Sequence, residues 1–160
     1  MSEHLRASAR REGDRGLVRV EDVYATTAED LWSAVTEPAR LARWIADVSG
    51  DLRVGGALRL RFTSGWQGTG EVLVCEPPAR LVVANREDDG SETVLEARIT
   101  AEGAGARLVV EERGLPADGT DPYVAGWTVH LEDLGAVLAG GERGDFAARW
   151  REHMGAAQQG

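Results

Sequence analysis

The sequence predicts an α+β fold in which one long C-terminal helix, centred on Trp127, lies across a curved antiparallel sheet of seven strands. Residues 48–115 alternate apolar and polar side chains between Gly and Pro turn signals, which is typical of an antiparallel meander. Residues 121–140 return to the helical period, with an apolar stripe on one side. A half-apolar sheet and a half-apolar helix each need a partner, so we expect them to pack together and close a largely apolar pocket.

Length and composition favour one globular domain. The chain has 160 residues, 42% of them hydrophobic, and no apolar run approaches the ~20 residues that span a bilayer. The net charge of −9 argues against a nucleic-acid partner. One Cys and three His show no metal-ligand spacing, so we expect neither a metal nor another cofactor. Residues 1–15 carry arginines with no apolar segment behind them, which predicts a disordered tail and a cytoplasmic protein.

Two short helices are expected after the first strand, which is rich in valine and runs from Leu17 to Ala25. Thr27 can cap the first helix, with Asp30 three residues later as a carboxylate variant of the capping box, and this helix should end near Thr36. Pro38 suits the first turn of the second helix, because that position needs no amide hydrogen.

Six further strands make up the meander. In one of them Leu58, Leu60 and Phe62 share one face while Arg59 and Arg61 share the other, as a sheet with one wet side requires. The six are expected at Asp51–Val54, Ala57–Thr63, Gly70–Glu76, Arg80–Arg86, Thr93–Ala101 and Arg107–Arg113.

The C-terminal part divides into the long helix and an extension. At about 100° per residue, an apolar stripe lies within about 80° of Trp127. It contains Tyr123, Val124, His130, Leu131, Leu134, Val137 and Leu138. Phe146, Trp150 and Met154 follow at fourfold spacing, which predicts a short extra helix that docks on the domain or on a second copy, as in a homodimer. The expected division is a tail at 1–15, a domain at 16–141 and an extension at 142–160.

Several local phrases, in the right order, resemble a known superfamily. They are Ala25-Thr26-Thr27-Ala28-Glu29-Asp30-Leu31-Trp32, Thr36-Glu37-Pro38, Leu41-x-x-Trp44, Val54-Gly55-Gly56, Gly70-Glu71-Val72-Leu73, Glu76-Pro77-Pro78-x-Arg80-Leu81, Gly114-Leu115-Pro116 and Gly126-Trp127-x-x-x-Leu131-x-x-Leu134. Residues 17–140 thus resemble the START-like or Bet v 1-like superfamily, also called SRPBCC, in the branch of the activator of heat-shock-protein-90 ATPase homologues. The resemblance implies the helix-grip fold.

The resemblance leaves the activity open, because one scaffold serves many functions. Members of the superfamily bind lipids, hormones and polyketides, cyclise or hydrolyse small molecules, or assist chaperones. The eukaryotic co-chaperone has an extra N-terminal domain that contacts the chaperone, and only residues 1–15 stand in its place here, which argues against a chaperone partner. Many relatives resemble a Thr-His pair where this chain has Glu111-Glu112, so a His-based role of that branch is not carried over to these positions.

Three polar residues are candidates for chemistry, because a buried polar side chain must find a partner or serve a ligand. Glu112 should face inward with Leu108 and Val110. Glu71 is placed inward with Leu73 and Cys75, although Val72 and Val74 make the opposite choice almost as plausible. His130, beside either Glu, could act as a general base. The plainer alternative is a packed histidine with one hydrogen bond and two glutamates near strand ends.

Three functions remain open on the sequence. The first is binding of a small apolar or amphipathic molecule in a cavity lined by Trp44, Phe62, Trp66, Leu73, Trp127, His130 and Leu131. The second is an enzyme of cyclase or hydrolase type that uses His130 with Glu71 or Glu112. The third is an interaction module that binds a protein, such as a chaperone ATPase, by its outer surface. Trp66, in the glycine-rich loop Ser64–Thr69, is either a mobile lid over the opening or a packed surface aromatic.

Overall fold

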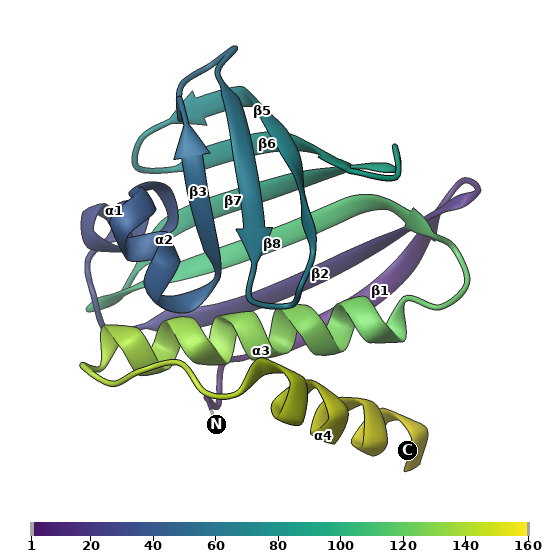
Figure 1. Cartoon of the computed structure of the whole chain (residues 1–160). Helices are drawn as coiled ribbons and strands as arrows, with labels where there is room; N and C mark the ends of the chain where they lie inside the picture. The colour runs from purple at the N-terminus through teal and green to yellow at the C-terminus, as the bar shows by residue number, and fades with distance from the viewer. Residues whose placement is uncertain (1, 160) are drawn as a thin grey trace.

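The computed structural model describes residues 2–159 and has the predicted α+β architecture, with one curved antiparallel sheet and a long helix across it (Figure 1). Within these residues the sheet has eight strands in the order β1-β2-β8-β7-β6-β5-β4-β3. The elements are β1 (Arg6–Glu12), β2 (Arg15–Tyr24), α1 (Ala28–Thr36), α2 (Pro38–Trp44), β3 (Ala46–Gly50), β4 (Ala57–Phe62), β5 (Gln67–Glu76), β6 (Arg80–Glu87), β7 (Glu92–Glu102), β8 (Gly105–Pro116), α3 (Asp121–Leu138) and α4 (Phe146–Gln159).

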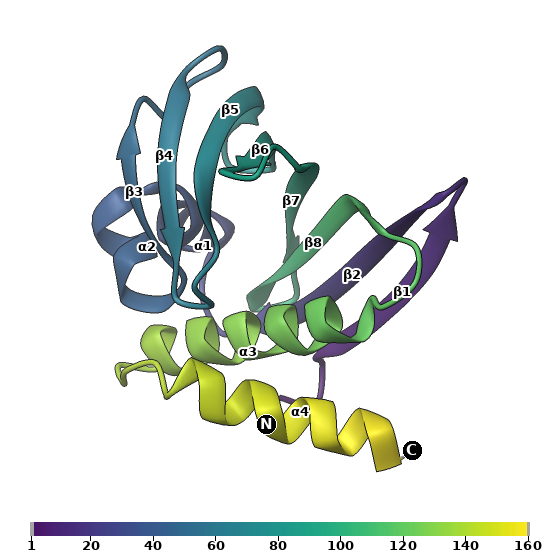
Figure 2. The ribbon, with the colours of Figure 1, turned by 45° about the vertical axis from the view of Figure 1, so that its right-hand side comes forward.

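The helices lie in two places. The sheet curls over α3, and α4 lies on the side of α3 that faces away from the sheet (Figure 2). The short helices α1 and α2 pack at one end, where α1 contacts β7 and β8 and α2 contacts α3 and β3. In the described part of the chain, no helix is long and apolar enough to cross a membrane.

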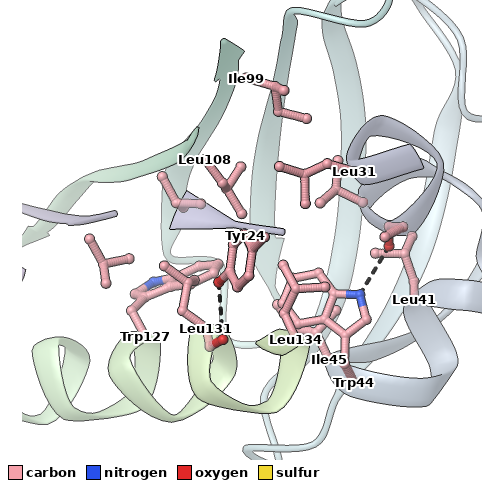
Figure 3. Close-up of a cluster of buried hydrophobic side chains, with 14 of the residues drawn as sticks. Tyr24, Leu31, Leu41, Trp44, Ile45, Ile99, Leu108, Trp127, Leu131 and Leu134 are labelled. Carbon is pink, nitrogen blue, oxygen red and sulfur yellow. Dashed lines mark hydrogen bonds between the residues drawn. The ribbon is translucent and has the colours of Figure 1, made fainter. Parts of the chain in front are cut away.

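The first helix and the long helix are anchored by specific local contacts. Thr27 accepts a hydrogen bond from the amide of Asp30 at 3.0 Å, which is the expected cap of α1. The Tyr24 hydroxyl donates to the carbonyl oxygen of Leu131 at 3.0 Å, and Trp44 Nε1 donates to that of Ala34 at 2.9 Å (Figure 3). These bonds satisfy the polar ends of two buried aromatic rings, so the hydrogen bonds offset the cost of burying them and each ring fixes a helix against the core.

Strand β1 corrects the prediction of a disordered tail at 1–15. Residues Arg6–Glu12 pair antiparallel with β2, from Arg6 opposite Glu21 to Glu12 opposite Arg15, and Gly13 makes the turn with φ of 62°. Every side chain of β1 is exposed. The strand therefore forms through backbone hydrogen bonds and lacks the apolar alternation from which strands are predicted. It raises the number of strands from the expected seven to eight.

The strand before β4 also lies elsewhere than predicted. β3 is Ala46–Gly50, whereas Asp51–Val54 forms the turn that follows it and leaves Val54 62% exposed. Gly50 has φ of 111°, and a Cβ there would lie 2.2 Å from the carbonyl oxygen of Ala57. Only glycine fits this close approach, so the sharp reversal comes at Gly50.

Candidate functional site

A small apolar cavity of about 110 Å³ lies between the sheet and the helices. Trp44 of α2 and Trp127 of α3 line one side, and Leu60, Phe62 and Leu95 of the sheet line another. Alternation turns Leu58, Leu60 and Phe62 of β4 to this face, which is the pattern expected from the sequence. The cavity is large enough for a ring-sized apolar group.

A larger cleft of about 960 Å³ adjoins this cavity and opens to solvent. It lies between β6, β7 and β8 on one side and the first half of α3 with the start of α4 on the other. Phe62, Asn85, Leu95 and Trp127 line both spaces, which therefore meet at these four residues. A molecule could place an apolar end in the inner cavity and a more polar end in the outer cleft.

Glu112 is held on the cleft wall by two donors. Trp127 Nε1 donates to Oε1 at 2.9 Å, and the Thr93 hydroxyl donates to Oε2 at 2.8 Å. Burial raises the pKa of Glu112, and the hydrogen bonds from Trp127 and Thr93 oppose that rise. Glu112 faces the helix on the same side of β8 as Leu108 and Val110, so the carboxylate and the indole of α3 meet across the cleft.

His130 lies among aromatic rings and is only 4% exposed. Its ring centroid is 5.3 Å from that of Trp127, 5.9 Å from Phe62 and 5.0 Å from Phe146. Nδ1 is buried and has no hydrogen-bond partner among the described residues. Burial lowers the pKa of His130 to about 3, so the imidazole is neutral at physiological pH and is a weak base.

Asn85 is a site residue that the sequence reasoning did not single out. It is 3% exposed, and its Oδ1 has no hydrogen-bond partner among the described residues. It lies opposite Gly70 of β5 and Thr93 of β7. Within β6, Leu81 and Val83 line the inner cavity, and Asn85 lies on the same face of the strand. A polar residue at the third inward position of an otherwise apolar alternation is the feature of the sequence from which Asn85 could have been predicted as a site residue.

The predicted inward positions of Glu71 and Leu73 are wrong. Glu71 is exposed, Leu73 is 44% exposed, and neither lines the cavity or the cleft. The register of β5 shifts between Val72 and Val74, which face Val83 and Val82, so Leu73 is the extra residue of a β-bulge. Cys75, beyond the bulge, packs inward beside Leu81 as expected. The bulge turns Cys75 inward, whereas Glu71 lies before it, between the buried Gly70 and Val72, and faces outward by regular alternation, away from His130.

The remaining predicted site residues divide between the two spaces. Trp44 lines the inner cavity, Trp66 and His130 line the outer cleft, and Phe62 and Trp127 line both. Leu131 lines neither, because it is fully buried in the core, where its carbonyl oxygen accepts from Tyr24. Glu112 and His130 line the same cleft, but the hydrogen bonds of the Glu112 carboxylate go to Trp127 and Thr93, and no bond joins the two predicted partners.

Trp66 lines the outer cleft and packs against Phe62. Its ring meets that of Phe62 edge to face, with centroids 5.4 Å apart. A Cβ at Gly68 would lie 2.7 Å from Trp66 Cη2, so the glycine leaves room for the indole to lie against β5. The loop is shorter than predicted, since β5 begins at Gln67.

Helix α4 supplies one wall of the cleft, through Phe146, Ala147 and Trp150. Trp150 Nε1 donates to the carbonyl oxygen of Pro122 at 2.9 Å. Arg149 pairs with the fully buried Asp133 at 2.6 Å, and with Glu132. The extension thus docks on its own chain, and the fourfold spacing of Phe146 and Trp150 places both rings on the side of α4 that lines the cleft.

The side chains that line the two spaces decide what the cleft can recognise. Residues 2–159 contain no group of three or more His, Cys, Asp or Glu side chains that could hold a metal ion. What the cleft offers is an apolar end, aromatic walls, a carboxylate and a buried amide oxygen. Such a combination can recognise a molecule that is apolar at one end and polar at the other.

Comparison with known proteins gives a family and several similar structures. A family model described as Activator of Hsp90 ATPase homolog 1-like protein matches residues 25–139. No curated protein matches the chain. The crystal structure of CalU16 from Micromonospora echinospora is 26% identical, with a TM-score of 0.78 over 96% of each chain.

Two further solved structures are similar to this chain. DynU16, a protein of the dynemicin biosynthetic locus, is 26% identical with a TM-score of 0.73, over 84% of this chain and 51% of its own. PFC0360w, an HSP90 activator from Plasmodium falciparum, is 19% identical with a TM-score of 0.64, over 77% of this chain and 96% of its own. The second likeness shows the fold alone.

Proposed function

This chain belongs to the family of Activator of Hsp90 ATPase homolog 1-like proteins, and from the geometry of its cleft we propose that it binds a small, mostly apolar or amphipathic molecule between α3 and the sheet. The apolar end of the molecule occupies the inner cavity, and its polar end lies in the outer cleft. Pockets for small molecules in proteins typically measure ~300–1,000 Å³, and the outer cleft of about 960 Å³ falls within that range.

The observation that carries the proposal is the unpartnered Oδ1 of Asn85 at the junction of the two spaces. A buried amide oxygen without a hydrogen bond costs roughly 1–3 kcal/mol. On the inner side the neighbouring lining residues of β6, Leu81 and Val83, are apolar and offer this oxygen no hydrogen bond. A donor group on a bound molecule would recover that cost, which gives the residue a role in binding.

Two further observations favour binding over the other functions. The imidazole of His130, with a pKa of about 3, is a weak base at neutral pH. Of its two proposed partners, Glu71 lies outside the cleft, and the carboxylate of Glu112 is hydrogen-bonded to Trp127 and Thr93 instead of to His130. A module that binds another protein by its outer surface needs no internal space, whereas this chain has an open cleft that a small molecule could occupy. DynU16, a similar protein, belongs to a biosynthetic locus, which fits a partner that is a small molecule.

Titration with phenylnaphthylamine, a neutral probe whose emission rises in apolar surroundings, tests the proposal. We expect emission to rise and to saturate at one probe per chain. Leu95 lines both spaces, so Leu95→Trp should fill their junction and abolish the rise. Val94→Trp is the matched control, because Val94 is the next residue on β7 and lines neither space. Equal binding by both variants, with both still folded by circular dichroism, would place the probe elsewhere and contradict the proposal.

A further inference from the structure

The outer cleft has a strong excess of negative charge. Four carboxylates line it, from Glu87, Asp89, Glu92 and Glu112, against the single guanidinium of Arg15 among the described lining residues. His130 adds no positive charge, because its pKa of about 3 keeps the ring neutral. An anion entering this cleft would meet repulsion, and a cation attraction.

Three of these carboxylates, those of Glu87, Asp89 and Glu112, have no arginine partner among the described residues. Glu92 is paired with Arg86 at 2.9 Å, and Asp89 accepts from Ser91. Glu112 accepts only from Trp127 and Thr93, and Glu87 accepts the Ser91 hydroxyl at 3.0 Å. Neutral donors leave the negative charge uncompensated, and Glu112 is bonded to Trp127, which also lines the inner cavity.

The hydrogen-bonding groups at the same place are acceptors. Besides the carboxylate of Glu112, the same cleft is lined by Asn85, whose buried Oδ1 has no partner among the described residues. An ammonium group has three donors and no acceptor, so it is the ionic group that matches carboxylates and an amide oxygen. A carboxylate or phosphate would leave these atoms without partners.

Aromatic rings complete the environment of a cation. The indoles of Trp66, Trp127 and Trp150 and the phenol of Tyr123 line the cleft, and a ring face attracts a cation within ~6 Å. Burial, together with the charges of Glu112, Glu87 and Asp89, raises the pKa of the Tyr123 hydroxyl, which is the effect expected in a region of negative potential.

We infer that the cleft selects amphipathic molecules that carry a positively charged amine over neutral and anionic ones. The inference rests on the proposed binding function and adds the charge of the ligand to it. The ammonium lies between Glu112 and the aromatic rings, and the apolar body of the molecule enters the inner cavity past Phe62 and Leu95.

Three probes of one shape test the selection by isothermal titration calorimetry: naphthylmethylamine, naphthylmethanol and naphthoate. The amine should bind the wild type roughly tenfold tighter than the alcohol, a factor that corresponds to ~1.4 kcal/mol, and tighter still than naphthoate. Glu112→Gln should remove most of that preference. Glu87→Gln should reduce it and leave the bond between Trp127 and Glu112 intact. Glu71→Gln is the control with the same change in net charge, since Glu71 lines neither space, and it should change nothing.

The possible results separate the two proposals. If the alcohol or naphthoate binds as tightly as the amine, or if Glu71→Gln weakens amine binding as much as Glu112→Gln, the selection for amines is wrong and the binding function stands. If all three fail to bind while phenylnaphthylamine still saturates the wild type and not Leu95→Trp, the selection is again wrong. If phenylnaphthylamine fails as well, both proposals fall.

Discussion

The indole of Trp127 on α3 donates its Nε1 hydrogen to Oε1 of Glu112 on β8 at 2.9 Å, and this bond joins the long helix to the sheet at the cleft. The contact is charge-assisted when the carboxylate is ionised, and it is half-buried, so it contributes more than an ordinary surface hydrogen bond. It also aims the carboxylate into the space that a ligand would share with Trp127.

A double-mutant cycle measures this bond. We predict that Trp127→Phe and Glu112→Leu are each destabilising, and that their effects on the free energy of unfolding in urea are non-additive by ~1–2 kcal/mol, because either change alone removes the donor or the acceptor of the same bond. The cycle separates the bond from the volume that Trp127→Phe removes. Effects that add within error would show that Trp127 contributes by packing alone.

The buried imidazole of His130 predicts a dependence of stability on pH. Its pKa of about 3 lies below the ordinary value of 6.5, so between these pH values the unfolded chain binds a proton that the folded chain does not. Stability from this group is therefore complete above about pH 6.5 and is lost as the pH falls toward 3. His130→Phe and His130→Gln should lose stability less steeply than the wild type, by at most ~1.4 kcal/mol per pH unit.

Urea unfolding at a series of pH values between 4 and 7 makes the comparison, in which the contributions of the other titrating groups largely cancel between wild type and variant. If the wild type and both variants follow parallel curves, His130 is protonated as easily in the folded protein as in the unfolded chain, and its enclosure among Phe62, Trp127 and Phe146 is contradicted.

The attachment of α4 depends on Arg149. This side chain pairs with Asp133, which is fully buried, at 2.6 Å, and Arg149→Met should leave that carboxylate without its cation while keeping most of the aliphatic stem. We expect hydrogen exchange of the amides in α4 to speed up at least several-fold, and binding of phenylnaphthylamine to weaken, because Phe146 and Trp150 line the cleft.

Arg151→Met is the matched control for this change, since Arg151 lies on the same helix and is exposed. It should leave both measurements unchanged. Equal exchange rates in the two variants would show that the apolar contacts of Phe146 and Trp150 hold α4 without the ion pair.

Much of the fold follows from patterns that depend on burial. The stripe around Trp127 predicted α3, and the alternation of Leu58, Leu60 and Phe62 predicted both β4 and its buried face. These predictions succeed because each pattern reports directly which face of an element leaves water. The cap at Thr27 succeeded for a related reason, since its hydrogen bond is local in sequence.

The predictions that failed concern features that leave no pattern of apolar and polar residues in the sequence. Strand β1 buries no side chain and pairs only through its backbone, so Arg6–Glu12 carries no alternation. The bulge at Leu73 reverses inside and outside within one strand, and nothing in its neighbours Val72 and Val74 marks where the extra residue stands. Asn85 was visible as a polar break in β6, but its missing partner is a property of the packed cleft alone.

Proton–nitrogen correlation NMR of the indole groups tests the central claim, that a small molecule binds between α3 and the sheet, most directly. Trp66 and Trp127 line the outer cleft, whereas Trp32 lines neither space and so serves as an internal reference. Saturation with phenylnaphthylamine should shift the Nε1–H resonances of Trp66 and Trp127, leave that of Trp32 in place, and shift none of them in Leu95→Trp. Unchanged resonances of Trp66 and Trp127 at saturating probe would contradict the claim.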